Sequence, residues 1–207
     1  MINVLVVDDS SFMRVNIKTL LESDNDIKVT GIARTGKDAI SKVLAIKPDI
    51  VTMDINLPDM SGIEVVELIL KQYPVPIIMV SSLTFEGAKE TIEALSKGAV
   101  DYVNKANLTG ETLIPKVRLA SEAAVSLSDV QANHIPAPTI YHSAFQIIGI
   151  GISTGGPKAL SKLIPEISPD ISAGIVVAQH MPPSFTKSLA ERLDSESKLK
   201  VKEAEEG

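Results

Sequence analysis

The chain has 207 residues, of which 44% are hydrophobic and 22% charged, a composition that fits one large or two modest globular domains. Its formal net charge of −6 argues against non-specific binding to nucleic acid or to an anionic membrane. The absence of cysteine excludes disulfides, thiolate nucleophiles and zinc–thiolate sites. We therefore expect protein or small-molecule partners and a fold that needs no oxidising compartment.

The amino-terminal stretch MINVLVVDD reaches acidic residues after a short apolar run and has no basic leader. No later apolar run approaches the roughly 20 residues that a membrane-spanning helix needs. The expectation is a cytoplasmic protein with no membrane insertion and no nucleic-acid partner.

Apolar runs rich in branched residues alternate with helix-period segments up to about Ala124. The runs are almost continuously apolar, which indicates strands buried on both faces of a parallel sheet. The predicted strands cover 3–7, 28–33, 49–53, 76–81 and 100–104, and the predicted helices cover 11–22, 36–46, 63–72, 86–97 and 111–124. This pattern predicts an α/β fold, a flavodoxin-like, doubly wound domain with five parallel strands over residues 1–122.

Local signals mark several helix ends in this first domain. Ser10 or Ser11 is the expected cap of the first helix, and Gly98 is the expected stop of the fourth. Pro115 is expected in the first turn of the fifth helix, where its missing N–H is tolerated.

The periodicity stops near the end of the fifth helix. Residues 123–144 are rich in small and polar residues and contain Pro136 and Pro138, so they are predicted to be a linker. A second βα pattern follows, with strands predicted at 145–151 and 173–179, helices at 158–167 and 184–193, and a last short strand in KLKVKEAEEG. It predicts the first part of a second parallel, Rossmann-like α/β domain over residues 145–207, with an open sheet edge.

Polar residues follow the predicted strands of the first domain, at the carboxyl ends where doubly wound sheets bind ligands. Asp54 ends the third strand and, taken alone, is either a reactive carboxylate or a strand-end cap. The other strand ends supply Asp8, Asp9, Ser81, Ser82 and Lys105. Three converging carboxylates would repel one another unless a cation shared them, and Mg²⁺ suits carboxylate and carbonyl oxygens.

This cluster predicts Mg²⁺-assisted phosphoryl transfer to Asp54, with Lys105 neutralising charge on the phosphoryl oxygens. Taken alone, the Asp8-Asp9 pair could be a solvated turn and Lys105 a surface lysine. The sequence contains no P-loop or glycine-rich kinase loop, so the phosphodonor is expected to come from outside the chain.

The motifs VVDDS, MDINLPDMSG, IMVSSLT and DYVNK resemble those of response-regulator receiver domains. The resemblance implies a histidine kinase as phosphodonor and Asp54 as phosphoacceptor. It implies that the metal is held by Asp8, Asp9 and Asp54 with the backbone carbonyl of Asn56. It also implies a hydroxyl that follows the phosphate, an aromatic switch and a phosphate-pairing lysine, namely Ser81, Tyr102 and Lys105. Ala106 departs from the family, which usually has proline there, so the placement of the lysine loop is in question.

The turn GISTGGP follows the first strand of the second domain. Residues 151–155 fit the G-x-S-x-G pattern of a serine nucleophile at a sharp strand-to-helix turn, but a plain glycine-rich turn or a nucleotide loop fits as well. His180 follows the next strand and is expected at the same sheet edge, where it could act as general base to Ser153. A lone histidine there would be structural, and the pairing with Ser153 favours the base.

STGGP and QHMPPSFTKSLAERL resemble the catalytic domain of CheB-type chemotaxis proteins. That resemblance implies hydrolysis of glutamate methyl esters and deamidation of glutamines on chemoreceptors, with methylated chemoreceptors as partners. It implies Ser153 as nucleophile and His180 as base, with Thr154 and Met181 near the oxyanion site. Ile152 departs from the family's usual alanine, and we expect it to be tolerated.

The family's third triad residue, an aspartate, is expected beyond position 207, and none of Asp170, Asp194 and Glu196 matches its motif. Loss of the triad acid lowers kcat by about 10⁴ even in an intact geometry. The hypothesis from the sequence is a complete receiver with a truncated, inactive esterase piece. Two functional hypotheses follow. The first is a methylesterase and deamidase controlled by its receiver, and the second is a phospho-receiver or phosphate-sink module whose esterase part is passive. A transcription factor would need a basic recognition-helix domain, which the sequence lacks.

Overall fold

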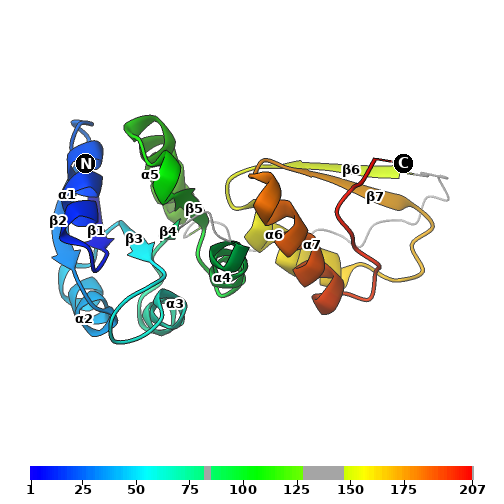
Figure 1. Cartoon of the computed structure of the whole chain (residues 1–207), viewed down its shortest axis with the longest axis horizontal. Helices are drawn as coiled ribbons and strands as arrows, with labels where there is room; N and C mark the ends of the chain where they lie inside the picture. The colour runs from blue at the N-terminus through cyan, green and yellow to red at the C-terminus, as the bar shows by residue number, and fades with distance from the viewer. Residues whose placement is uncertain (82–84, 128–146, 207) are drawn as a thin grey trace.

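The computed structural model describes residues 1–81, 85–127 and 147–206, which form two units. The first unit is built on a five-stranded parallel sheet with the order β2-β1-β3-β4-β5 (Figure 1). Its strands are β1 (Ile2–Val7), β2 (Ile27–Ala33), β3 (Ile50–Asp54), β4 (Ile77–Ser81) and β5 (Asp101–Asn104). This order confirms the predicted flavodoxin-like sheet.

Helices cover both faces of this sheet, which explains why its strands are continuously apolar. The helices are α1 (Ser11–Leu21), α2 (Gly36–Ile46), α3 (Gly62–Gln72), α4 (Phe85–Ser96) and α5 (Gly110–Leu127). Val4 and Val6 belong to the core under α1 and α5, whereas Leu5 and Val7 belong to the core under α2, α3 and α4. The alternation of side chains along β1 thus supplies both cores.

The helix boundaries agree largely with the predicted start and stop residues. Ser10 caps α1, because its Oγ accepts a hydrogen bond from the N–H of Met13 at 3.4 Å. Gly98 follows α4 with φ +123°, a conformation that suits glycine. Pro115 lies further from the helix start than predicted, because α5 begins at Gly110, and the helix continues through it.

The α5 helix also continues into the range that we predicted as linker, ending at Leu127. The remainder of that predicted linker, and the first residues of the predicted strand at 145–151, lie outside the described residues.

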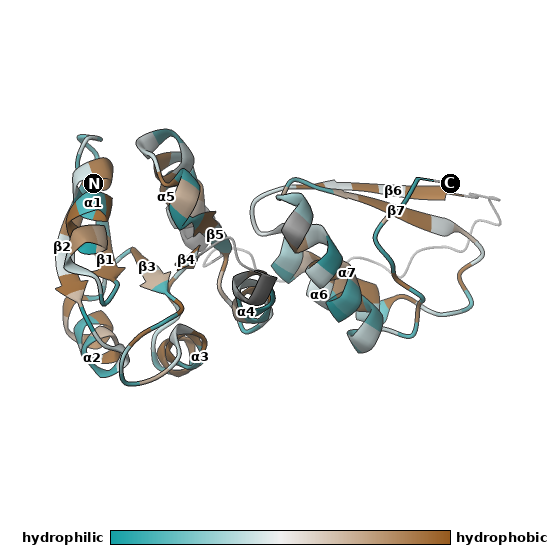
Figure 2. Cartoon of the chain, in the orientation of Figure 1, coloured by the Kyte–Doolittle hydropathy of each residue, from teal (hydrophilic) through white to brown (hydrophobic). Residues whose placement is uncertain are grey.

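The second unit pairs two parallel strands, β6 (Ile147–Ile152) and β7 (Gly174–Gln179), with the helices α6 (Gly156–Glu166) and α7 (Pro183–Glu196). Both strands are strongly hydrophobic (Figure 2), yet Ile147 and Val176 remain 68% and 60% exposed. The sheet therefore leaves apolar side chains uncovered within the described part of the chain.

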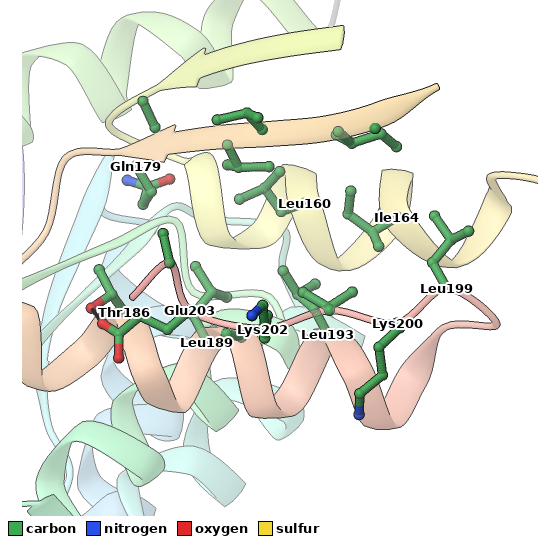
Figure 3. A pocket seen from close by; sticks show the side chains of 18 of the residues that line it. Leu160, Ile164, Gln179, Thr186, Leu189, Leu193, Leu199, Lys200, Lys202 and Glu203 are labelled. Carbon is green, nitrogen blue, oxygen red and sulfur yellow. Dashed lines mark hydrogen bonds between the residues drawn. The ribbon is translucent and has the colours of Figure 1, made fainter. Parts of the chain in front are cut away.

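The predicted last strand is wrong for the described residues 198–206, which contain no strand. The segment runs beside α7 instead, and the N–H of Val201 donates to Asp194 Oδ1 at 2.7 Å, an acceptor that replaces a strand partner. Between this segment, α7, α6 and β7 lies a cavity of about 770 Å³ with mainly apolar walls, including Leu160, Ile164 and Leu189 (Figure 3). Packing against α7 rather than β7 therefore keeps the segment out of the sheet.

The two units are packed against each other through α4 on one side and α6 and α7 on the other (Figure 1). Buried side chains of α7, including Phe185 and Leu189, belong to the same apolar core as Ala88 and Ile92 of α4. No helix in the described ranges is long and apolar enough to cross a membrane.

Candidate functional site

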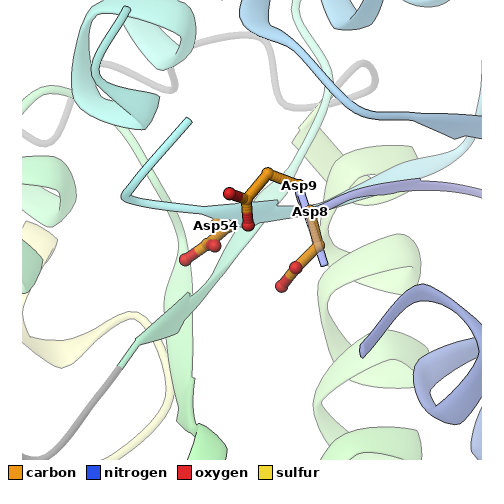
Figure 4. Close-up of side chains that lie close together, drawn as sticks. All are labelled: Asp8, Asp9 and Asp54. Carbon is orange, nitrogen blue, oxygen red and sulfur yellow. The ribbon is translucent and has the colours of Figure 1, made fainter. Parts of the chain in front are cut away.

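An acidic cluster lies where β1 and β3 end. These strands are parallel neighbours with Val7 opposite Met53, so Asp8, Asp9 and Asp54 come to one edge of the sheet. Carboxylate oxygens of the three lie within 4.8 Å of one another (Figure 4). Asp8 and Asp54 are buried, whereas Asp9 is exposed. The structure thus brings together the carboxylates that the sequence placed on separate strand ends.

Lys105 reaches this cluster from the end of β5. Its Nζ lies 2.8 Å from Asp54 Oδ2 and 3.1 Å from Asp8 Oδ2. The Ala106 N–H donates to Asn104 Oδ1 at 2.8 Å, a hydrogen bond that proline could not make. This hydrogen bond restrains the turn that carries Lys105. Ala106, which stands where the family usually has proline, thus fixes the backbone by a hydrogen bond instead of by a proline ring.

Burial dominates the electrostatics of the cluster. It raises the pKa of the Asp54 carboxyl, with the Asp8 charge adding to the effect and Lys105 opposing it. Burial lowers the pKa of Lys105, but its contacts with Asp54 and Asp8 outweigh that effect and hold the pKa above its usual value. Lys105 therefore pairs with two of the three carboxylates, and the Arg14 guanidinium contacts the backbone carbonyls of Asp8 and Asp9 rather than their carboxylates.

The donor set fits a hard divalent cation. All three side chains offer carboxylate oxygens, and among the described residues the buried Asp8 Oδ2 has no partner other than its 3.1 Å ion pair with Lys105. Oxygen ligands with several waters are what Mg²⁺ prefers. The residues present are therefore chemically suited to Mg²⁺.

The loop after Asp54 is shaped by Gly62. A Cβ on Gly62 would lie 2.0 Å from the backbone oxygen of Asp54, so only glycine fits there. Its N–H donates to the Ile55 carbonyl at 2.7 Å, and Asn56 and Ser61 form a β-bridge across the loop. This closure keeps exposed Asn56 next to Asp54, whose carboxylate accepts a hydrogen bond from the Asn56 backbone.

Ser81 is buried at the end of β4, beside the strand that carries Asp54. Its Oγ accepts a hydrogen bond from Thr91 Oγ1 at 2.9 Å. Thr91 lies in α4, and its Oγ1 also lies 2.6 Å from the Gly87 carbonyl oxygen, so its one hydroxyl hydrogen is shared between these two acceptors. The sequence does not predict this role of Thr91, because a threonine inside an amphipathic helix carries no signal of its partner in a strand.

Tyr102 lies on β5 with its ring directed away from the sheet towards the second unit. The ring stacks on Phe185 of α7, with centroids 4.7 Å apart and planes at 11°. Burial raises the pKa of Tyr102, and the Asp101 charge adds to the effect. The sequence did not identify Phe185 as a partner, since the two residues lie in different units.

Ser153 and His180 follow β6 and β7 at the same sheet edge. These strands are in register with Ile152 opposite Gln179, and the His180 N–H donates to the Ile152 carbonyl at 3.1 Å. Both residues are exposed. Within the part of the chain that the structure describes, the Ser153 hydroxyl and the His180 imidazole are not hydrogen-bonded to each other.

Two glycines form the turn after Ser153. Gly155 has φ +74°, and a Cβ on Gly156 would lie 1.9 Å from Gln179 Oε1. The Gln179 side-chain amide donates to the carbonyl of Ser153 at 3.1 Å and to that of His180 at 3.3 Å. Gln179, which the sequence did not single out, therefore ties the two strand ends together.

The serine turn lies near the first unit. Thr154 is half-buried, and Met181 packs against the apolar core that the units share. A Cβ on Gly155 would lie 4.0 Å from the Val100 carbonyl of the first unit. The serine turn thus sits beside the segment that leads into β5.

None of the three acids weighed in the sequence analysis as the third triad residue forms a hydrogen bond or ion pair with His180 among the described residues. Asp194 accepts hydrogen bonds from Lys200 and Val201, and Glu196 pairs with Arg192 at 2.7 Å. Asp170 is exposed. Among the described residues, no carboxylate is hydrogen-bonded to His180.

Two family models match the chain. Residues 4–118 match the response regulator receiver domain, and residues 148–207 match the CheB methylesterase family. Similar curated proteins include a protein-glutamate methylesterase/protein-glutamine glutaminase of Thermotoga maritima, 46% identical over 218 residues, and one of Pyrococcus horikoshii, 43% identical over 222 residues. Each alignment covers all of this chain but only 62% and 60% of the relative, so the chain spans about three-fifths of their length.

Solved structures resemble the first unit. The response regulator domain of Thermotoga maritima CheB is 46% identical, with a TM-score of 0.53, and the match covers 59% of this chain and 97% of that one. The chemotaxis protein CheY4 of Vibrio cholerae is 28% identical, with a TM-score of 0.52 and coverage of 58% and 98%.

Proposed function

The chain belongs to the response-regulator receiver family and is of the CheB type, and on this premise we propose that it is a chemotaxis response regulator switched by phosphorylation of Asp54. The observation that carries the proposal is the position of Lys105 Nζ, within ion-pair distance of both Asp54 and Asp8 at the mouth of the acidic cluster. A histidine kinase is the proposed phosphodonor, and the cytoplasm is the proposed location.

In the proposed reaction, an Asp54 carboxylate oxygen attacks the phosphorus of a phosphohistidine. The P–N bond breaks, the imidazole leaves, and an acyl phosphate forms on Asp54. Mg²⁺ held by Asp8, Asp9, Asp54 and the Asn56 carbonyl would neutralise charge on the phosphoryl oxygens. Lys105 supplies a second positive charge to the same oxygens, because it already contacts Asp54.

The proposed switch begins at Ser81 and Thr91. A phosphoryl group on Asp54 offers a stronger acceptor for the Ser81 hydroxyl, and a shift of Ser81 changes its hydrogen bond with Thr91. Because Thr91 lies in α4, and α4 packs against α6 and α7, the change is transmitted to the second unit. Tyr102 is the proposed aromatic member of this switch, through its stacking on Phe185.

The activity proposed for the CheB-type protein is hydrolysis of glutamate methyl esters, and deamidation of glutamines, on chemoreceptors. Ser153 is the proposed nucleophile and His180 the proposed base, with Thr154 and Met181 beside the oxyanion site. Ester attack by Ser153 releases methanol, and water then frees the receptor carboxylate. The shared sheet edge of Ser153 and His180 and the glycine turn between β6 and α6 support these roles.

The contact between the units supports control of this activity by the first one. The first unit packs beside the serine turn through Val100, and it contacts α7 through Tyr102. In the proposed scheme these contacts restrict access of a receptor segment to Ser153 until Asp54 is phosphorylated. The alternative is a phospho-receiver or phosphate-sink module, and the observation in its favour is that the Ser153 hydroxyl and the His180 imidazole are not hydrogen-bonded to each other among the described residues.

Phosphotransfer from a phosphorylated chemotaxis histidine kinase tests the proposal. Intact-mass measurement should detect one acid-stable, base-labile phosphoryl group on the wild-type chain and none on Asp54→Asn. Labelling of the Asp54→Asn variant at the wild-type rate would rule out the acceptor assignment. Methanol release from a methylated receptor then separates the esterase from the phosphate sink.

A further inference from the structure

A basic pocket of about 410 Å³ lies where α4 meets α6 and α7. Its walls include four cations, Lys97 at the end of α4, Lys158 and Lys162 on α6, and Arg192 on α7, with Glu196 as the one acid. Such a local excess of positive charge is unexpected in a chain with a formal net charge of −6.

Two of these cations have acidic partners. Lys97 Nζ lies 2.6 Å from Glu67, and an Arg192 terminal nitrogen lies 2.7 Å from Glu196. Lys158 and Lys162 form no ion pair within the described residues. These two lysines are four residues apart on one helix, a spacing at which like charges repel. Their charge is therefore uncompensated.

The pocket also contains polar hydrogens without acceptors. Lys158 is half-buried, and its Nζ contacts the Gly98 carbonyl at 3.1 Å, which leaves its other hydrogens free of a protein acceptor among the described residues. Burial and the Lys162 charge lower the pKa of Lys158. Arg192 Nε is buried and has no hydrogen-bond partner in the described structure. A buried donor without an acceptor is costly, typically about 1–3 kcal/mol.

We propose that this pocket binds a small oxyanion of the phosphate class, using Lys158, Lys162 and Arg192 as donors. A phosphate offers several acceptor oxygens and a charge of opposite sign, so it would satisfy the free donors and reduce the repulsion on α6. The Ser161 hydroxyl, also in the wall, provides an uncharged donor. The pocket is large enough to hold inorganic phosphate with bound water.

The anion would lie at the contact between the two units. Its donors Lys158, Lys162 and Arg192 belong to the second unit, and the first unit closes the pocket with Lys97 and with Gly98, whose carbonyl holds Lys158. A ligand that binds only when these walls are together stabilises the packed arrangement by mass action. This inference concerns a site separate from Asp54 and does not rest on phosphoryl transfer there.

Isothermal titration of the full chain with inorganic phosphate tests the proposal. The buffer contains a chelator and has constant ionic strength, so that no metal at the acidic cluster binds phosphate. The Asp54→Asn variant is titrated in parallel, because binding at the acidic cluster would change in this variant and binding in the basic pocket would not. We expect saturable binding to one site in both proteins. Lys162 is exposed, so Lys162→Gln should fold normally and should weaken binding about tenfold, the loss of one charge-assisted hydrogen bond.

Lys187→Gln is the matched control, because it removes the same charge from an exposed position of α7 outside the pocket. Binding to this variant should equal that of the wild-type chain. Thermal unfolding provides the second measurement, since phosphate should raise the midpoint of the wild type and of Lys187→Gln more than that of Lys162→Gln. Absence of saturable heat, or equal weakening in both lysine variants, would overturn the site.

Discussion

Tyr102 and Phe185 stack with their ring centroids 4.7 Å apart, although one belongs to β5 of the receiver and the other to α7 of the second unit. Phe185 is fully buried and Tyr102 is 8% exposed. Offset-stacked aromatic pairs contribute about 0.5–1.5 kcal/mol beyond the area that they bury. The pair therefore ties the proposed aromatic switch to the esterase-like unit.

Phe185→Ala should destabilise the packing between the units. Loss of a fully buried phenylalanine typically lowers the free energy of unfolding by about 3–5 kcal/mol. Denaturant unfolding followed by circular dichroism measures the change. Leu163→Ala, which truncates a side chain that is 48% exposed, is the control and should change the free energy by about 0.5 kcal/mol or less. Equal effects of the two substitutions would contradict the role of the stack.

Asp54→Asn should stabilise the metal-free protein at neutral pH. The folded-state pKa of Asp54 is raised, chiefly by burial, so its ionised form opposes folding. Protonation removes this penalty, and the wild-type chain should approach the variant as pH falls through that raised pKa. Thermal unfolding in chelator checks this, with a rise of about 2–4 °C expected for each kcal/mol. Asp170→Asn is the control, because it removes the same charge from an exposed position.

Mg²⁺ should stabilise the wild-type chain and make it more stable than Asp54→Asn, the reverse of their order in chelator. A ligand at 100 times its Kd adds about 2.7 kcal/mol to the free energy of unfolding. Asp54→Asn and Asp8→Asn should show a smaller gain, because each removes a carboxylate from the cluster. Chelation should also stop phosphotransfer to Asp54. Full-rate phosphotransfer in chelator would mean that the acidic cluster serves another purpose.

Gly62→Ala should disrupt the loop that follows Asp54. The added Cβ would lie 2.0 Å from a backbone oxygen, which cannot move without shifting Asp54 itself. Such overpacking lowers the free energy of unfolding by about 1–3 kcal/mol or more, and phosphotransfer should slow as well. Gly149→Ala is the matched control, since a Cβ there meets no atom within 4 Å. Chemical denaturation of both variants compares them directly, and a tolerant Gly62 would refute the steric argument.

The 207-residue chain should release methanol from methylated receptor at a rate far below that of a complete triad enzyme. His180 lacks a hydrogen-bonded carboxylate among the described residues, and loss of the triad acid lowers kcat by about 10⁴. A methanol assay on the phosphorylated and unphosphorylated chain measures this. Ser153→Ala sets the background, and wild-type release well above that background would contradict the prediction.

The receiver fold was predictable from the sequence because its signals are local. Continuous apolar strands, amphipathic helices and the caps at Ser10 and Gly98 each depend on neighbours in the chain. The carboxylates at the strand ends were predictable too, since parallel strands bring their carboxyl ends to one edge. Asp8, Asp9 and Asp54 therefore meet as the pattern required.

The strand predicted at the end of the chain is wrong because its formation depends on distant residues rather than on local signals. The alternation in KLKVK fits a strand, but whether a strand forms depends on a partner elsewhere in the fold. Asp194 offers the Val201 N–H an acceptor on α7, and the segment packs there.

The sequence by itself determined the βα order, the acidic cluster with Lys105, and the edge shared by Ser153 and His180. Only the tertiary structure decided that Thr91 holds Ser81, that Phe185 covers Tyr102, and that cations from three helices surround one pocket. The physical reason is the separation in sequence between the interacting residues. Strand and helix periods are set by adjacent residues, whereas these contacts join side chains that only the packing of separate elements brings together.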